Sequence, residues 1–223
     1  MTAFIVGSSG LVGNYILKHA PEYYSNVVSL SRSKPDNSEN DQITTILEKN
    51  SDEWTKQIDN FQLKEDNTAF FSGLGTTKAA AGGIENQRLI DYDLNLNLAK
   101  AAKAKGFKKY ILISSYGASK DSKFPYLKMK GELEDAVKDL GFESTIILQP
   151  GVLLGDRKIS KGFGNNLMVS LTSWSTGTPF SKYLFNPIHG EDVAKAALKL
   201  AQKETSEKVV VVGGSELYDI ARS

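Results

Sequence analysis

A glycine-rich turn near the N-terminus constrains the fold more than any other part of the sequence. The turn reads Gly7-Ser8-Ser9-Gly10-Leu11-Val12-Gly13, and it connects the apolar stretch Ala3–Val6 to an amphipathic one. Between a strand and a helix, one glycine permits a sharp turn, a second lets the backbone approach a pyrophosphate, and a third lets the helix pack closely. N–H groups at the start of the helix then point toward the phosphates. The spacing and its position predict a dinucleotide-binding loop, with a purely structural turn as the alternative.

The rest of the chain alternates short apolar stretches with longer amphipathic ones. The predicted strands are Ala3–Val6, Val27–Leu30, Ile43–Leu47, Thr68–Phe71, Tyr110–Ile113, Thr145–Leu148 and Val209–Val212. The predicted helices are Leu11–Tyr23, Asp52–Phe61, Ile84–Lys105, Tyr126–Leu140 and Gly190–Gln202. Continuously apolar strands that alternate with helices are typical of a parallel sheet covered on both faces. We therefore expect an α/β fold with a doubly wound, Rossmann-like parallel sheet, in a single domain over residues 1–223.

One stretch interrupts this alternation. Residues 155–187 are rich in glycine, serine and threonine, and the stretch is too long for a simple connection. Its aromatic residues include Phe163, Trp174, Phe180, Tyr183 and Phe185. We expect an insertion that forms a small lobe over the substrate side of a cleft, with a loop that packs on its own small core as the alternative.

The composition excludes several other kinds of site. There are 27 lysine and arginine residues against 26 aspartate and glutamate residues, which gives a net charge of +1. A protein that binds nucleic acid nonspecifically normally has a clear excess of basic residues, so this function is disfavoured. The absence of cysteine removes disulfides, thiolate zinc sites and cysteine nucleophiles, and two histidines are too few for a histidine-rich metal site. No apolar run approaches the roughly 20 residues that span a bilayer, so any membrane association is expected to be peripheral.

The residues after the second predicted strand bear on the choice of cofactor. An NAD site uses an aspartate or glutamate about 20 residues past the glycine turn to hold the adenosine ribose. This chain instead has Ser31-Arg32-Ser33-Lys34. A guanidinium binds a 2′-phosphate through two hydrogen bonds, whereas a carboxylate would repel it. We predict NADP(H) rather than NAD(H), with Arg32 and Ser33 at the adenosine phosphate; solvated surface charges are the alternative.

A serine, a tyrosine and a lysine form the candidate catalytic group. The fifth predicted strand ends in Ser114-Ser115, and Tyr126 and Lys130 share one face of the following helix. A lysine ammonium beside a phenol lowers the phenol pKa, so Tyr126 can act as a general acid or base on a carbonyl or alcohol oxygen. A serine at the strand end can hydrogen-bond the same oxygen. The end of the strand is uncertain by one residue, which leaves Ser115 and Ser114 both open.

Together these residues resemble the short-chain dehydrogenase/reductase superfamily, and in particular its atypical, extended-like members. Further motifs are similar to the family of the human Tat-interacting tumour-suppressor oxidoreductase and to its small fungal mitochondrial outer-membrane members. These motifs are Leu74-Gly75-Thr76-Thr77, Ile113-Ser114-Ser115-Tyr116-Gly117-Ala118, residues 126–132, and the run from Gln149 to Arg157. The resemblance extends from about Ala3 to Val212.

The resemblance implies roles for individual residues. Tyr126 is the implied acid/base, Lys130 also holds the nicotinamide ribose, and Ser115 or Ser114 orients the substrate oxygen. The implied cofactor-binding residues are Gly7, Ser8, Ser9, Gly10, Leu11, Val12, Gly13, Arg32, Ser33, Leu74, Gly75, Tyr126, Lys130 and Arg157. Two positions depart from the family pattern. Gln149 stands in place of an arginine, and Asp91 stands where many members have an asparagine that relays protons.

The resulting hypothesis is an NADPH-dependent oxidoreductase that transfers a hydride to or from a small carbonyl or alcohol substrate. The rival hypothesis is an NADPH-binding regulatory protein that acts through contacts with a protein partner, because fold alone does not determine function. The complete serine, tyrosine and lysine set favours the enzyme. The resemblance further implies a place on the cytoplasmic face of the mitochondrial outer membrane, with peripheral attachment.

Overall fold

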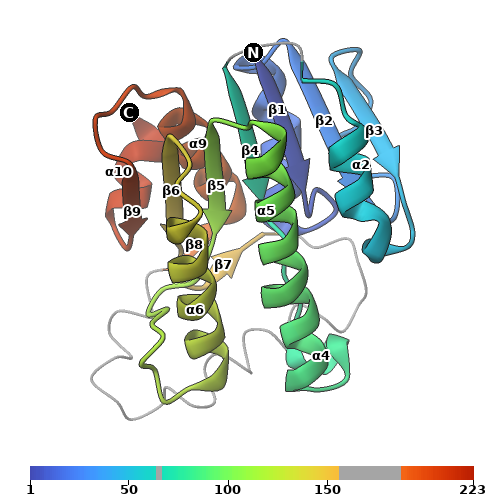
Figure 1. Cartoon of the computed structure of the whole chain (residues 1–223). Coiled ribbons are helices and arrows are strands. Elements are labelled where there is room, and N and C mark those ends of the chain that lie inside the picture. Colours follow the sequence, from blue (N-terminus) through green and yellow to red (C-terminus); the bar gives the residue numbers. More distant parts are fainter. Residues whose placement is uncertain (64–66, 156–186) are drawn as a thin grey trace.

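The computed structural model describes residues 1–63, 67–155 and 187–223, and its centre is a parallel sheet of seven strands within these ranges (Figure 1). The strand order is β3-β2-β1-β4-β5-β6-β9. The strands are β1 (Thr2–Val6), β2 (Asn26–Ser31), β3 (Ile43–Leu47), β4 (Thr68–Ser72), β5 (Lys109–Ile113), β6 (Ser144–Gln149) and β9 (Val209–Gly213). Each of the seven corresponds to a predicted strand, so the expected doubly wound α/β fold is confirmed.

Helices cover both faces of the sheet, as Figure 1 shows. Helices α1 (Leu11–His19), α9 (Gly190–Gln202) and α10 (Glu216–Arg222) lie on one face, and α2 (Trp54–Asn60), α5 (Asn95–Lys105) and α6 (Pro125–Asp139) lie on the other. Alternate residues of each central strand enter the two cores. In β1, for example, Ala3 and Ile5 pack toward α1 and α9, whereas Phe4 and Val6 pack toward α5. Burial on both faces is why these strands are continuously apolar.

The predicted helix Ile84–Lys105 is broken into three parts. It begins as α4 (Ile84–Arg88), widens into the π-helical turn η3 (Leu89–Leu94), and continues as α5. Such wide turns are rare in proteins and often occur at functional sites. Sequence reasoning did not predict the short helix α3 (Lys78–Ala81) or α10, and short 3₁₀ turns η1 (Ala20–Glu22) and η2 (Ser51–Glu53) flank α1 and α2.

The predicted lobe covers residues 155–187, of which all but Gly155 and Pro187 lie outside the described residues. On either side of them, β7 (Leu153–Leu154) and β8 (Ile188–His189) pair in parallel. This pairing brings the two flanks of the stretch together at the carboxyl ends of β5 and β6 (Figure 1). In the ranges that the structure describes, no helix has the length and apolar character needed to cross a membrane.

The strand order places a crevice at a defined point of the sheet. β1 pairs with β2 on one side and with β4 on the other. From β1 the chain builds the sheet outward through β2 and β3, and it then returns to β4 and builds outward on the other side, so the strand order reverses between β1 and β4. In open α/β sheets, ligands bind at the carboxyl ends of the strands where the order reverses in this way. The turn that follows β1 lies at this point.

Candidate functional site

The glycine turn between β1 and α1 packs tightly against the end of β4. A Cβ atom on Gly7 would overlap the Gly73 carbonyl group, and a Cβ on Gly13 would overlap the Gly7 carbonyl oxygen. Gly7 also has a φ of 77°, in the left-handed region that favours glycine. Gly10 differs from both, because it is exposed and has more room. Gly7 and Gly13 therefore serve the packing of the turn, whereas Gly10 lies where a ligand would approach.

Helix α1 begins directly after Gly10. Its first turn has no acidic residue, and no side chain within the described part of the chain caps it. The first N–H groups of a helix lack partners within the helix, and their partial positive charge attracts anions. The start of α1 can therefore hold a phosphate group.

A cavity of about 750 Å³ extends from this helix start across the carboxyl ends of the strands. Its walls come from the glycine turn and α1, the segments after β2 and β4, the turn η3, the end of β5, and α6. The lining residues are Ser9, Gly10, Leu11, Val12, Asn14, Tyr15, Lys18, Ser33, Lys34, Pro35, Asp36, Asn37, Gly73, Leu74, Gly75, Thr76, Thr77, Asp91, Ile113, Ser114, Tyr126, Lys130 and Leu153.

Most of the predicted cofactor-binding residues line this cavity. Among the residues that the structure describes, the exceptions are Gly7, Ser8, Gly13 and Arg32. The Ser8 hydroxyl is buried and shares a hydrogen bond of 2.7 Å with the Ser29 hydroxyl on β2. Arg157 lies outside the described residues. The lining residues that sequence reasoning missed include Asn14, Tyr15 and Lys18 on α1, for which no motif signalled a role.

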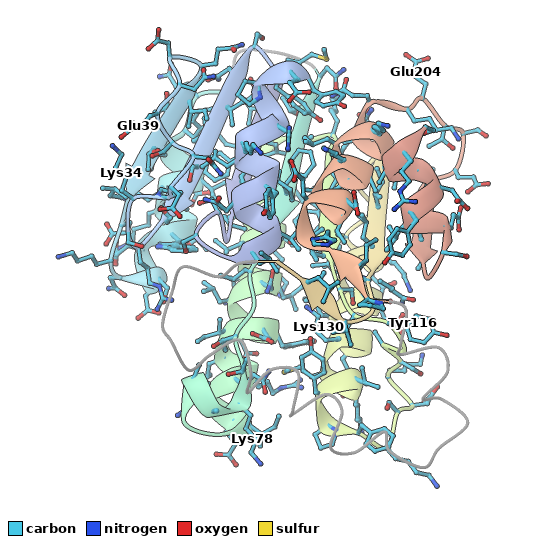
Figure 2. All side chains as sticks on the ribbon, turned by 180° about the vertical axis from the view of Figure 1, so that it is seen from behind. Lys34, Glu39, Lys78, Tyr116, Lys130 and Glu204 are labelled. Carbon is cyan, nitrogen blue, oxygen red and sulfur yellow. The ribbon has the colours of Figure 1, made fainter. Side chains whose placement is uncertain are left out.

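The segment after β2 forms the outer end of the cavity. Ser33 and Lys34 line it, whereas Arg32 is exposed next to them. The Lys34 ammonium makes an ion pair of 3.2 Å with Glu39, and Figure 2 shows both residues at the edge of the molecule. The sequence pattern pointed to Arg32 and Ser33; of these two, Ser33 lines the cavity, and Lys34, which was not predicted, lines it as well. Asp36 lines the same region.

Tyr126 and Lys130 lie on the cavity side of α6, as their four-residue spacing predicts. Lys130 is only 3% exposed, and its ammonium donates a hydrogen bond of 3.3 Å to the Ile113 carbonyl oxygen at the end of β5. Figure 2 shows Lys130 on α6, below the strand ends. Burial lowers the pKa of Lys130, while the carboxylates of Asp91 and Glu134 favour its charged form.

Gly131 explains how the loop before α6 fits against that helix. A Cβ atom on Gly131 would overlap the backbone of Ser119 and Lys120. The Ser119 N–H also donates to the Leu127 carbonyl oxygen at 3.1 Å. This close approach fixes the start of α6, and with it Tyr126, relative to the end of β5.

The two candidate serines have different surroundings. In the described part of the structure, Ser114 lines the cavity together with Tyr126 and Lys130, and Ser115 does not line it. The Ser114 hydroxyl is buried and donates a hydrogen bond to Glu134, and its backbone N–H donates to the Leu148 carbonyl oxygen at 2.7 Å. The tertiary structure therefore brings Ser114, of the two, to the other site residues.

Asp91 occupies the inner wall of the cavity on the turn η3. It is 1% exposed, and burial raises its pKa, with Lys130 acting in the opposite direction. One Asp91 carboxylate oxygen accepts a hydrogen bond of 2.7 Å from the Thr76 N–H, and the other accepts one of 3.3 Å from the Gln87 side chain. A buried carboxylate beside a buried ammonium is a common feature of functional sites.

Asp91 belongs to a polar stripe that supports this wall, and sequence reasoning singled out only Asp91 of its three residues. Gln87, Asp91 and Asn95 follow one another at four-residue spacing and are all buried. Asn95 accepts a hydrogen bond of 2.5 Å from the Ser72 hydroxyl and donates one of 3.2 Å to the Leu74 carbonyl oxygen. The stripe thus holds the segment after β4 in place, and polar residues at helical spacing were the signal that could have revealed it.

The sheet order and the glycine turn define a Rossmann-like α/β fold that other solved structures share. The solved structure "MoeE5 in complex with UDP-glucose and NAD" matches with a TM-score of 0.69 and 15% identity, over 96% of this chain and 75% of that one. The UDP-glucose 4-epimerase of Thermotoga maritima matches with a TM-score of 0.69 and 16% identity, over 100% of this chain and 82% of that one. These similarities establish the fold.

Closer similarity identifies the family. The HIM1 family model matches residues 38–175, and the chain belongs to the HIM1 family. The mitochondrial protein FMP52 of Candida albicans is 41% identical over 230 residues, covering 100% of this chain and 99% of that protein. FMP52 of Saccharomyces cerevisiae is 40% identical over 228 residues, covering 100% of this chain and 97% of that protein. The predicted resemblance to fungal mitochondrial proteins is confirmed, and the resemblance to the human oxidoreductase stays a prediction.

Proposed function

We propose that this protein is an NADP-dependent oxidoreductase of the short-chain dehydrogenase/reductase type, acting on a small carbonyl or alcohol substrate. The observation that supports this function best is that one and the same cavity is lined by the glycine turn and by Ser114, Tyr126 and Lys130. A dinucleotide whose pyrophosphate lies at the start of α1 would extend along the strand ends toward α6. NADPH, when bound, supplies the hydride.

The nucleotide end of the cavity supports NADP(H) over NAD(H). Many NAD sites have a carboxylate directly after the second strand, and this chain has Arg32 there, followed by Ser33 and Lys34 at the cavity. Their charges suit a 2′-phosphate. Asp36 also lines the region and Glu39 pairs with Lys34, so the preference depends on Arg32 and Lys34 against these two carboxylates.

The other end of the cavity supports acid–base chemistry. Tyr126 donates a proton to a substrate carbonyl oxygen, or takes one from an alcohol, and the nearby Lys130 ammonium lowers the pKa of the phenol. Ser114 contacts the same substrate oxygen and orients it.

A two-part experiment tests this function. Calorimetric titration with NADPH and with NADH measures the cofactor preference. A panel of small aldehydes, ketones and quinones, with the matching alcohols and NADP⁺, is then followed by NADPH absorbance. We expect tighter binding of NADPH and turnover of at least one panel compound. Binding without any turnover would favour the regulatory protein, and the lack of any cofactor binding would contradict both hypotheses.

The named relatives suggest where the protein acts. Proteins FMP52 of Candida albicans and Saccharomyces cerevisiae are described as mitochondrial. We extend this to the present chain, with peripheral attachment to the cytoplasmic face of the outer membrane. Protease treatment of intact mitochondria, followed by carbonate extraction, tests the proposal. The protein should be digested while the outer membrane is intact, and carbonate should release it.

A further inference from the structure

Three buried ionisable side chains lie at the α6 end of the cavity, and their charges do not cancel. Asp91 on η3 is 1% exposed, and Lys130 and Glu134 on α6 are each 3% exposed. Asp91 and Lys130 line the cavity, whereas Glu134 lies behind its wall in the described structure. A buried charge is costly unless an opposite charge or hydrogen bonds compensate it, so the contacts of these groups show how each is held.

Both carboxylates accept hydrogen bonds at both of their oxygens. Asp91 accepts from the Thr76 N–H at 2.7 Å on one oxygen and from the Gln87 side chain at 3.3 Å on the other. Gln149 Nε2 donates to Glu134 Oε1 at 3.0 Å and to Oε2 at 2.9 Å. Donors of this kind stabilise the charged form of a carboxylate. All four oxygens are therefore placed to carry negative charge.

Lys130 supplies the positive charge among these three groups. Burial lowers its pKa, and attraction by Asp91 and Glu134 favours its charged form. Arg88, next to η3, is exposed and pairs with Glu132 at 2.7 Å, so these two add no net charge. Two carboxylates and one ammonium thus leave one negative charge in excess in this part of the described structure.

An excess negative charge distinguishes between the two redox forms of a nicotinamide cofactor. The oxidised ring carries a positive charge and the reduced ring is neutral, whereas the phosphates and both riboses are the same in the two forms. Buried charges are screened much less than exposed ones, so this end of the cavity favours the cationic ring. The exposed groups at the nucleotide end act equally on both forms and cancel from the comparison.

We propose that Asp91 gives the cavity a preference for the oxidised cofactor, so that NADP⁺ binds more tightly than NADPH, and that Glu134 adds to this preference from behind the wall. The inference rests on the proposed function, in which the dinucleotide extends along the strand ends toward α6. A thermodynamic cycle then makes NADPH a stronger reductant when bound than when free, which suits the reduction of a carbonyl.

Calorimetric titration with NADP⁺ and with NADPH tests the proposal without any substrate. In the unmodified protein, the Kd of NADPH should exceed that of NADP⁺ by about ten-fold, the order expected for one buried elementary charge. Asp91→Asn keeps the size of the side chain and removes its charge, so it should weaken NADP⁺ about ten-fold and change NADPH by less than about two-fold. Glu134→Gln should weaken NADP⁺ by a smaller factor of about two to three, because Glu134 does not line the cavity in the described structure.

Asp93→Asn is the matched control, because it removes a carboxylate from the same turn at a partly buried position that does not line the cavity within the described residues. It should leave both Kd values unchanged. An Asp91→Asn protein that keeps the full preference for NADP⁺, or one in which both forms are weakened alike, would overturn the proposal. An unmodified protein that binds NADPH at least as tightly as NADP⁺ would also overturn it. If Asp91→Asn does not fold, an unchanged ratio of the two Kd values in Glu134→Gln decides against the proposal.

These titrations also separate this inference from the proposed function. Equal affinity for the two redox forms, together with turnover of a panel compound, would leave the oxidoreductase intact and reject the role of Asp91. A preference for NADP⁺ that Asp91→Asn removes, in a protein without turnover, would support the role of Asp91 and favour the regulatory protein. Binding of neither form would contradict the proposed function and this inference together.

Discussion

The two ends of the cavity are built in different ways. The nucleotide end consists of backbone at the glycine turn and of exposed side chains, and the Lys34–Glu39 ion pair there is 62% and 81% exposed. The end at α6 consists of charged side chains with almost no exposure, namely Asp91, Lys130 and, behind the wall, Glu134.

This difference determines how each end responds to substitution. Water and salt screen the exposed charges, so changing one of them alters binding only modestly. The buried charges interact through a poorly polarisable interior, so changing one of them alters pKa values, stability and rate. The glycine turn forms a third case, because substitutions there act through steric overlap.

The largest effect is expected from Tyr126→Phe, at the buried end. The change removes one hydroxyl and little volume, so stability and NADPH affinity should hardly change. Turnover should fall by a factor on the order of 10² to 10⁴, the usual contribution of a positioned acid or base. Steady-state kinetics with the most active panel compound measure this loss. Turnover close to that of the unmodified protein would reject Tyr126 as the acid/base.

The next largest effect is expected from Gly10→Val, at the glycine turn. Gly10 lines the cavity, and a branched side chain there would occupy the approach of the pyrophosphate. NADPH binding should be lost, while circular dichroism shows a native fold. Gly13→Ala is the contrasting variant, because its Cβ would overlap the Gly7 carbonyl oxygen and should lower stability. Normal NADPH binding by a folded Gly10→Val protein would make Gly10 a turn residue only.

Asp91→Asn should change how the free energy of unfolding depends on pH. Burial raises the pKa of Asp91 above 3.8, so the folded state binds this proton more tightly than the unfolded state. The free energy of unfolding therefore falls as pH rises from the pKa of Asp91 in the unfolded state to its pKa in the folded state. The fall amounts to about 1.4 kcal/mol for each pH unit between these two pKa values. Asp91→Asn should lack this fall, so its stability relative to the unmodified protein should increase from about pH 4 upward.

Urea unfolding at a series of pH values measures this difference. Asp93→Asn is the control, because it removes a carboxylate from the same turn η3 at a partly buried position. Parallel curves of stability against pH for Asp91→Asn and the unmodified protein would contradict the prediction. They would mean that the electrostatic attraction of the Lys130 ammonium fully compensates the burial of the carboxylate.

The smallest effects are expected at the exposed nucleotide end. Lys34→Asp and Arg32→Asp should each reduce the preference for NADPH over NADH, by a factor of about two to five for exposed charges. Lys34→Asp should have the larger effect, because Lys34 lines the cavity and Arg32 does not within the described residues. Both effects should shrink as salt concentration rises. Calorimetry that finds equal affinity for the two cofactors in the unmodified protein would remove the predicted preference altogether.

The amino-acid sequence by itself determined the sheet and the location of the site. The five inner strands are recognisable because helices bury both of their faces, which requires mostly apolar residues, whereas the edge strands β3 and β9 are only partly buried. The glycine turn is recognisable because backbone overlap excludes any side chain at Gly7 and Gly13. The spacing of Tyr126 and Lys130 places both on one helix face wherever that helix packs. All of these features depend on residues close together in the chain.

Only the tertiary structure decided which side chains complete the site. The choice of Ser114 over Ser115 depends on where β5 ends relative to α6, and on the hydrogen bond to Glu134. The burial of Asp91 beside Lys130 depends on the packing of η3 against α6, and no local pattern distinguishes it from an exposed helical aspartate. Gln149 donates hydrogen bonds to the carboxylate of Glu134, 15 positions earlier on another element. Periodicity shows which face of an element is buried, whereas the contacts of a buried charge depend on how separate elements pack together.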